Sequence, residues 1–138
     1  MNHGKHAALV CAAAMLFIAA QHARADETIH VMLTDNEIRL DNNEAKTGRI
    51  TFDVNNAAKD KTEHEFVVLR TDKDAAHLPV RKGQVPESDF RKVGEVEDIA
   101  QGASKRLSLK LAPGRYVLIC NRPGHYAMGM HTSFVVAR

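Results

Sequence analysis

The chain has 138 residues, of which 44% are hydrophobic and 26% are charged, and its formal net charge is +2. This length excludes two large domains, and the hydrophobic content excludes an intrinsically disordered chain. The net charge is too small, and the basic residues too dispersed, to indicate a nucleic acid or an anionic membrane as a partner. Two cysteines are too few for a disulfide scaffold.

The N-terminal residues have the pattern of a signal peptide. A short start that includes Lys5 is followed by the unbroken apolar run of residues 7–20, and residues 23–25 (Ala-Arg-Ala) fit the small-x-small cleavage rule. The run is shorter than the about 20 residues that a membrane-spanning helix needs. We therefore predict cleavage after Ala25, export to the periplasm, and a mature domain of residues 26–138 that does not insert into a membrane. Retention of the leader as an anchor is the alternative.

Removal of the leader changes the charge and the cysteine count. Of the 19 basic residues, Lys5 and Arg24 are lost, which leaves 17 against the 17 acidic residues. Cys11 also lies in the leader, so Cys120 is the one cysteine of the mature domain. An unpaired thiol in an oxidising compartment is a liability unless something occupies it, and a metal ion is one such occupant.

After the leader, the sequence predicts β-strands separated by polar turns. Apolar and polar residues alternate, and clusters of Gly, Asn, Asp and Pro separate the alternating segments. The dense apolar run from His64 to Leu69 predicts a strand that is buried on both faces. Pro113-Gly114 predicts a tight turn between two strands. The expected strands lie, in chain order, within residues 28–33, 38–40, 50–55, 64–69, 107–111, 116–120 and 132–136.

Residues 71–103 break this pattern. The segment is charged and punctuated by Pro and Gly, and its apolar residues, such as Leu78, Phe90, Val93 and Ile99, are isolated. Because it is longer than an ordinary hairpin loop, we expect a long surface excursion with room for a short helix or an edge strand. About seven to eight strands in a domain of this size predict an all-β fold, a Greek-key β-sandwich or barrel.

Three residues with metal-binding side chains follow one another in the loop between the last two strands. Cys120, His125 and Met130 are spaced five residues apart. Thiolate with thioether favours copper over hard cations such as magnesium or calcium, and a finger-type zinc site would need further Cys or His at short spacing. A trigonal copper site needs one more imidazole. His64 is the best candidate, since it occupies the same face of its strand as the apolar Phe66.

A histidine at the head of an apolar strand, followed by C-x4-H-x4-M before the final strand, resembles the pattern of the cupredoxins, the small blue copper proteins. The loop spacing is similar to that of the rusticyanin, sulfocyanin and auracyanin branch, and the resemblance covers essentially all of the mature chain. It implies one type-1 copper ion as cofactor. By this resemblance His64 and His125 bind copper through imidazole nitrogen, Cys120 binds it through thiolate, and Met130 binds it weakly along the axis.

The resemblance also implies a function. We expect a monomeric one-electron carrier that exchanges electrons with redox partner proteins, such as a cytochrome or a terminal oxidase, with His125 as the exit route. A periplasmic copper-binding or delivery protein in copper homeostasis is the alternative, because the same ligands would serve it. We expect no enzyme activity. Copper enzymes of this fold need a second copper centre, and His30, His77 and His131 show no clustered spacing.

Three further residues carry predictions of their own. Met128 is a second thioether close to Met130, and spacing favours Met130 as the axial ligand. We therefore expect Met128 to contribute to an apolar docking patch near His125.

Asn55 and Asn56 precede the strand that His64 begins, and we hypothesise that their amides hydrogen-bond backbone groups around the ligand loop.

Overall fold

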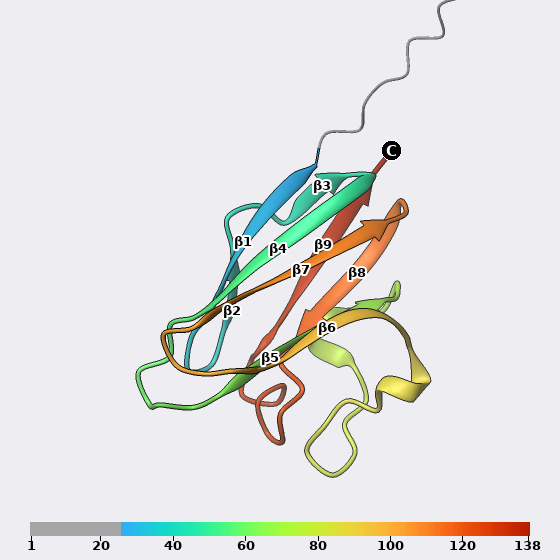
Figure 1. The fold of residues 1–138 in the computed structure, drawn as a ribbon. Helices are drawn as coiled ribbons and strands as arrows, with labels where there is room; N and C mark the ends of the chain where they lie inside the picture. Colours follow the sequence, from blue (N-terminus) through green and yellow to red (C-terminus); the bar gives the residue numbers. More distant parts are fainter. Residues whose placement is uncertain (1–25) are drawn as a thin grey trace, which may run out of the picture.

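The computed structural model describes residues 26–138, and the predicted signal peptide lies outside these described residues (Figure 1). Among the described residues, no helix has the length and the apolar character needed to cross a membrane. The strands are β1 (Glu27–Leu33), β2 (Ile38–Leu40), β3 (Glu44–Lys46), β4 (Gly48–Asn56), β5 (His64–Arg70), β6 (Arg91–Ile99), β7 (Ser104–Leu111), β8 (Gly114–Ile119) and β9 (His131–Ala137). Two 3-10 helices, η1 (Ala75–His77) and η2 (Glu87–Asp89), lie between β5 and β6.

These strands form two sheets. One sheet has the order β2-β1-β4-β7, and the other has the order β3-β9-β8-β5-β6. Most neighbouring strands pair antiparallel, whereas β1 with β4 and β3 with β9 pair in parallel. The predicted all-β fold is confirmed. The described residues contain nine strands where about seven to eight were expected, because the short β3 and the polar β6 were not recognised.

The period-two alternation of the sequence buries one face of each sheet. In β1 and β4 every second residue is buried. Phe52 of β4 lies at the centre, and its ring centroid is 5.3 Å from that of Phe66 and 5.3 Å from that of Phe134. Tilted aromatic pairs add stabilisation beyond the area that they bury. The three rings therefore join the two sheets across one core.

Strands β5 and β8 are buried on both faces, as the dense apolar run predicts. Their outer face is covered by residues 75–90, which supply the apolar partners of a second hydrophobic cluster. This outer cluster consists of Val67, Leu69, Ala75, Leu78, Val85, Val117, Ile119 and Tyr126, with Phe90 packed against it. Two of the apolar residues that look isolated in the sequence, Leu78 and Phe90, thus pack in the same cluster.

The expectation for residues 71–103 is confirmed in that the segment contains short helices and an edge strand, but it contains more regular structure than a surface excursion. β6 is a nine-residue edge strand that pairs antiparallel with β5. Its sequence conceals it, because six of its nine residues are charged or glycine. The pairing register also shifts along β5 and β6, and Asp98 adopts a positive φ of 50°. Such bulges break the regular alternation that identifies a strand in a sequence.

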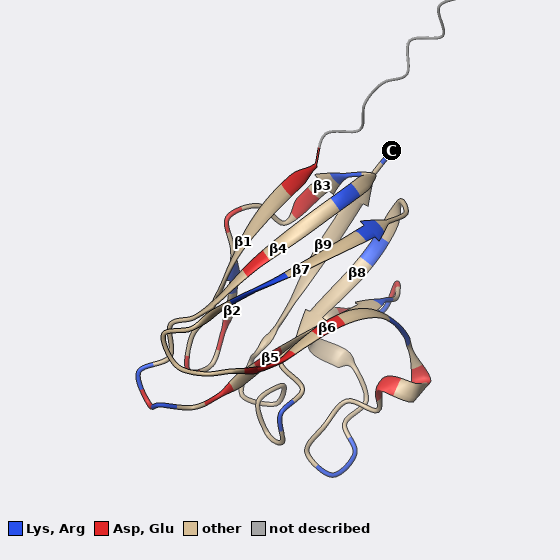
Figure 2. Ribbon diagram, in the orientation of Figure 1, with Lys and Arg blue, Asp and Glu red and all other residues tan. Residues whose placement is uncertain are grey.

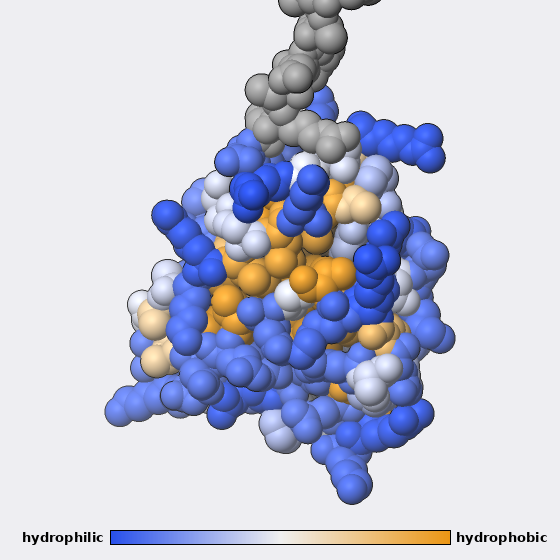
Figure 3. Space-filling view, turned by 45° about the vertical axis from the view of Figure 1, so that its right-hand side comes forward, coloured by the Kyte–Doolittle hydropathy of each residue, from blue (hydrophilic) through white to orange (hydrophobic). Residues whose placement is uncertain are grey.

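The surface is mixed in character. Basic and acidic residues are interspersed along the ribbon (Figure 2), and residues 26–138 contain equal numbers of each. One flank shows an apolar area framed by polar side chains (Figure 3). Half-buried apolar residues of the two edge strands β6 and β7, namely Val93, Val96, Leu107 and Leu109, pack against the core.

Candidate metal centre

Three of the predicted ligands meet at one end of the sandwich. His64 is the first residue of β5, Cys120 directly follows β8, and His125 lies in the loop between β8 and β9. Since β5 and β8 are antiparallel neighbours, the start of β5 lies beside the end of β8. The sheet therefore brings together His64 and Cys120, which are 56 positions apart in the chain.

The ligand atoms of these residues form a compact triangle. His64 Nδ1 is 3.2 Å from His125 Nδ1, and Cys120 Sγ is 3.3 Å from His125 Nδ1 and 3.6 Å from His64 Nδ1. By plane geometry from these three sides, the point equidistant from the atoms lies about 2.0 Å from each. Metal–nitrogen and metal–sulfur bonds in zinc sites measure about 2.0–2.1 and 2.3 Å. The triangle therefore has the size that one transition-metal ion requires.

Met130 lies at the end of the same loop. Its side chain is fully buried, and its carbonyl accepts a hydrogen bond from the Cys120 N–H at 3.1 Å. The preceding Gly129 has a φ of 117°, and a Cβ atom there would lie 2.9 Å from the Asn36 carbonyl oxygen, so glycine permits this close approach. Met128, by contrast, is 54% exposed. Burial and spacing both favour Met130 over Met128 as an axial thioether.

The thiol of Cys120 is fully buried and forms no disulfide among the described residues. The backbone N–H of Glu65 donates a hydrogen bond to Cys120 Sγ at 3.4 Å. Burial raises the pKa of the Cys120 thiol, and the Glu65 N–H opposes that effect. A thiolate in this place needs a positive charge beside it, which a metal ion supplies.

The two imidazoles are held neutral. Burial lowers the pKa of His64, and the neighbouring His125 lowers it further. Burial also lowers the pKa of His125, with a contribution from the Arg122 guanidinium. A neutral ring presents a nitrogen lone pair to a metal without first losing a proton. Two imidazoles, one thiolate and a buried thioether are the donors of a trigonal type-1 copper site, so the residues present fit one copper ion.

The two asparagines have other partners than the ligand loop. Asn56 donates hydrogen bonds to the Thr62 and Ile99 carbonyls, each at 2.8 Å. It thereby fixes the segment before His64. Asn55 donates to Ser104 Oγ on the neighbouring strand β7 at 3.0 Å. The hypothesis of amide bonds around the ligand loop is therefore wrong, and Asn56 instead holds the backbone that precedes His64.

Sequence reasoning missed two residues of the ligand loop that tie it to residues 75–87. Asn121 is 3% exposed and hydrogen-bonds the Val85 backbone, and Tyr126 is 4% exposed and hydrogen-bonds the Ala75 carbonyl. The available signal was a polar residue directly after a buried strand. Val85 lies 36 positions from Asn121, and Ala75 lies 51 positions from Tyr126. No local sequence pattern identifies these partners.

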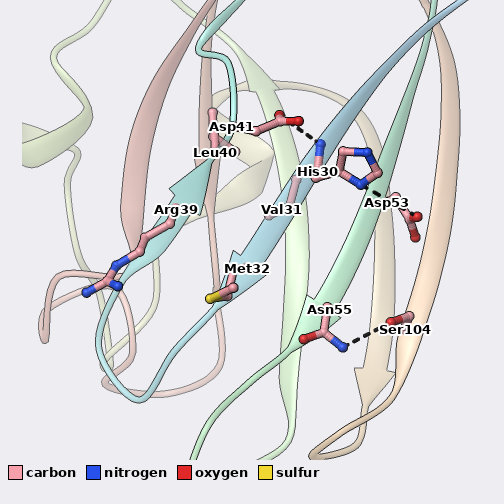
Figure 4. A pocket seen from close by; sticks show the side chains of 9 residues that line it. All are labelled: His30, Val31, Met32, Arg39, Leu40, Asp41, Asp53, Asn55 and Ser104. Carbon is pink, nitrogen blue, oxygen red and sulfur yellow. Dashed lines mark hydrogen bonds and ion pairs between the residues drawn. The ribbon is translucent and has the colours of Figure 1, made fainter.

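A groove of about 440 Å³ lies on the outer face of the four-stranded sheet (Figure 4). Its lining includes His30, Met32 and Asp53, and His30 Nδ1 lies 3.8 Å from Asp53 Oδ2. None of its lining residues belongs to the metal centre. His30 is therefore an exposed residue of that sheet.

Several solved structures are similar to this chain. Reduced auracyanin from the photosynthetic bacterium Roseiflexus castenholzii is 24% identical, with a TM-score of 0.62 over 83% of this chain and 100% of that one. Auracyanin A, described as a "blue" copper protein of Chloroflexus aurantiacus, is 19% identical, with a TM-score of 0.55 over 82% and 100%. Rusticyanin from Thiobacillus ferrooxidans is 17% identical, with a TM-score of 0.57 over 82% and 79%. These likenesses show a shared fold.

No curated protein sequence matches the chain significantly. The model of the cupredoxin-like domain family, however, matches residues 7–136. This match spans nearly the whole sequence and includes the entire metal centre. The chain therefore belongs to the cupredoxin-like domain family.

Proposed function

We propose that this chain is an exported type-1 copper protein that carries one electron at a time between redox partners in the periplasm. In this proposal His64 and His125 would hold copper through imidazole nitrogen and Cys120 through thiolate, and Met130 would supply a weaker thioether ligand. The observation that carries the proposal is the triangle of His64 Nδ1, His125 Nδ1 and Cys120 Sγ, whose sides measure 3.2 to 3.6 Å.

The chain supplies the conditions for rapid electron transfer. Copper, when bound, supplies the redox change between Cu(I) and Cu(II), which this ligand set suits about equally. His64 begins β5 and Cys120 directly follows β8, and these two strands are paired in the core, so neither ligand moves without disturbing the sheet. The Glu65 N–H holds Cys120 Sγ in place. A fixed ligand frame keeps the rearrangement that accompanies electron transfer small.

The route for electrons leads through His125. It is the one half-buried residue of the four proposed ligands, whereas the other three are fully buried. Close to it, Met128 is 54% exposed, and Val80 on the adjoining loop is 44% exposed. These apolar side chains support short-lived docking of a monomer, without long-range charge steering, to a cytochrome or a terminal oxidase.

Burial of the ligands favours the electron carrier over the copper-delivery protein. A delivery site must release its ion to a partner, which needs accessible ligands. Here His64, Cys120 and Met130 are all fully buried. The proposal assigns no catalytic reaction to the chain.

Export rests on the sequence of residues 1–25. The apolar run with its small-x-small site supports secretion through a cleaved leader. The mass of the protein purified from the periplasmic fraction tests this part. A mature chain that begins at Asp26 is expected, and the full-length chain in the membrane fraction would overturn it.

The visible spectrum and the voltammogram of the copper-loaded mature protein test the main proposal. We expect an intense blue or green thiolate-to-copper band and a reversible one-electron wave, with copper retained against a chelator. A colourless copper adduct would overturn the type-1 assignment. A coloured protein that surrenders its copper rapidly to a chelator would favour the delivery role instead.

A further inference from the structure

The residue after the cysteine ligand is bonded to a distant segment of the chain. Asn121 Oδ1 accepts a hydrogen bond from the Val85 N–H at 2.7 Å, and Asn121 Nδ2 donates to the Val85 carbonyl at 2.9 Å. The same Nδ2 donates to Glu87 Oε1 at 2.9 Å. The Asn121 amide thus satisfies both backbone groups of Val85, as a neighbouring strand would. The two bonds to Val85 are buried, so they are protected from competition by water.

A tight hairpin touches the ligand loop at two more points. Arg81 and Gln84 form a β-bridge, and the turn between them consists of Lys82 and Gly83, which have φ values of 51° and 81°. The Gly83 carbonyl accepts a hydrogen bond from the Gly124 N–H at 2.9 Å. The Gln84 side chain donates to the Asn121 carbonyl at 2.7 Å. A non-glycine residue with positive φ carries backbone strain, which the bonds on both sides of the turn offset.

The residue after the second histidine ligand is bonded to the same segment. The Tyr126 hydroxyl donates to the Ala75 carbonyl at 2.6 Å and accepts from the Leu78 N–H at 2.9 Å. The Tyr126 side chain is 4% exposed and belongs to the outer cluster. Residues 75–87, here called the clamp segment, therefore hold the ligand loop directly beside Cys120 and directly beside His125.

We infer that Asn121 and Tyr126 are positioning residues, through which the clamp segment holds Cys120 and His125 in metal-binding geometry before copper arrives. This inference rests on the proposed function, because it assigns the clamp to the copper site. A purely structural role would add stability to the whole domain. A positioning role additionally makes the ligand loop rigid in the apoprotein and slows the loss of copper.

Tyr126→Phe provides the sharpest test, because the chain offers a matched control. Tyr116 is also a buried tyrosine, and its hydroxyl donates to the Ala112 carbonyl at 2.7 Å near the start of β8, at the end remote from the ligands. Tyr126→Phe and Tyr116→Phe each remove one hydroxyl and keep the ring. We expect Tyr126→Phe to speed copper release to a chelator about five- to tenfold and to shift the thiolate-to-copper band, as one lost hydrogen bond corresponds to that factor. Tyr116→Phe should change neither.

Asn121→Ala and amide exchange in the apoprotein complete the test. The Cys120 N–H, bonded to the Met130 carbonyl, and the Met130 N–H, bonded to the His125 carbonyl, report on the loop and lose no partner in either variant. We expect these two amides to exchange about five- to tenfold faster in Tyr126→Phe and Asn121→Ala than in Tyr116→Phe. Equal exchange and equal copper release in all three variants would overturn the inference. A colourless wild-type copper adduct would instead overturn the proposed function, while the apoprotein exchange still decides the role of the clamp.

Discussion

His64 Nδ1 and His125 Nδ1 face each other at 3.2 Å, with their ring centroids 5.1 Å apart and their planes at 71°. Both nitrogens also face Cys120 Sγ. Buried polar atoms that converge on one point are costly unless a shared partner satisfies them. One metal ion would satisfy all three atoms at once, so the arrangement has the geometry that the proposed copper site requires.

Replacing Cys120 by Ser tests the strongest ligand. The hydroxyl fits the space of the thiol, but it supplies neither the thiolate charge nor the sulfur-to-copper transition. We expect the intense visible band to disappear and copper affinity to fall by more than about 100-fold, since even the loss of a group that supports a ligand costs 10- to 100-fold. Absorption and metal content after dialysis measure both effects. A coloured Cys120→Ser protein would contradict the assignment of the ligand.

Replacing Met130 by Leu tests the axial ligand. The volume is conserved, so the buried site of Met130 should remain packed. Loss of the thioether destabilises Cu(II) relative to Cu(I), so the reduction potential should rise while the colour persists. Each tenfold change in that preference corresponds to about 59 mV. Voltammetry of Met130→Leu and Met128→Leu measures it, and a rise confined to Met128→Leu would reverse the assignment.

Most strands and the clustering of the candidate ligands His64, Cys120 and His125 were predictable because their signals are local. The five-residue spacings of Cys120, His125 and Met130 lie in one loop, and β1, β4 and β9 show simple alternation. His64 was predictable from its place at the head of a strand. Burial on one face of a strand produces a period of two, and a metal restricts the chemistry of its ligands to a few residue types.

The clamp segment and β6 were not predictable for physical reasons. β6 is a charged edge strand with a shifted register, so its exposed face and its bulges remove the alternation. The bonds of Asn121 to Val85 and Glu87 span 36 and 34 positions. Such bonds follow from the tertiary fold, and an asparagine is equally compatible with an ordinary turn.

Copper uptake by the apoprotein should release one proton near pH 7. Burial is the main cause that raises the pKa of the Cys120 thiol, and the Glu65 carboxylate adds to it, while the Arg122 charge opposes it. Burial also lowers the pKa of His64 and His125. The apoprotein therefore holds a proton on sulfur and none on the two imidazoles at pH 7. Because copper binds the thiolate, its affinity should rise about tenfold per pH unit.

Calorimetry of copper binding in buffers with different ionisation enthalpies counts these protons. The pH dependence should flatten above the raised pKa of the thiol, where the apoprotein is already a thiolate. It should steepen in acid, where protonated His64 and His125 compete with the metal. Cys120→Ser serves as the control, since it has no thiol proton to release. Copper binding by the wild type without proton release at pH 7 would contradict the expected state of Cys120.

Phe52→Ala should destabilise the apoprotein by about 3–5 kcal/mol. The Phe52 side chain is fully buried between the sheets, and its ring packs against Phe66 and Phe134. Truncation removes these contacts and leaves a cavity that rigid strands cannot close. Denaturant unfolding of the metal-free protein measures the loss without the contribution of bound copper. Met32→Ala, at a side chain that is 45% exposed, should stay within about 0.5 kcal/mol. Equal losses in the two variants would mean that Phe52 does not lie at the centre of the core.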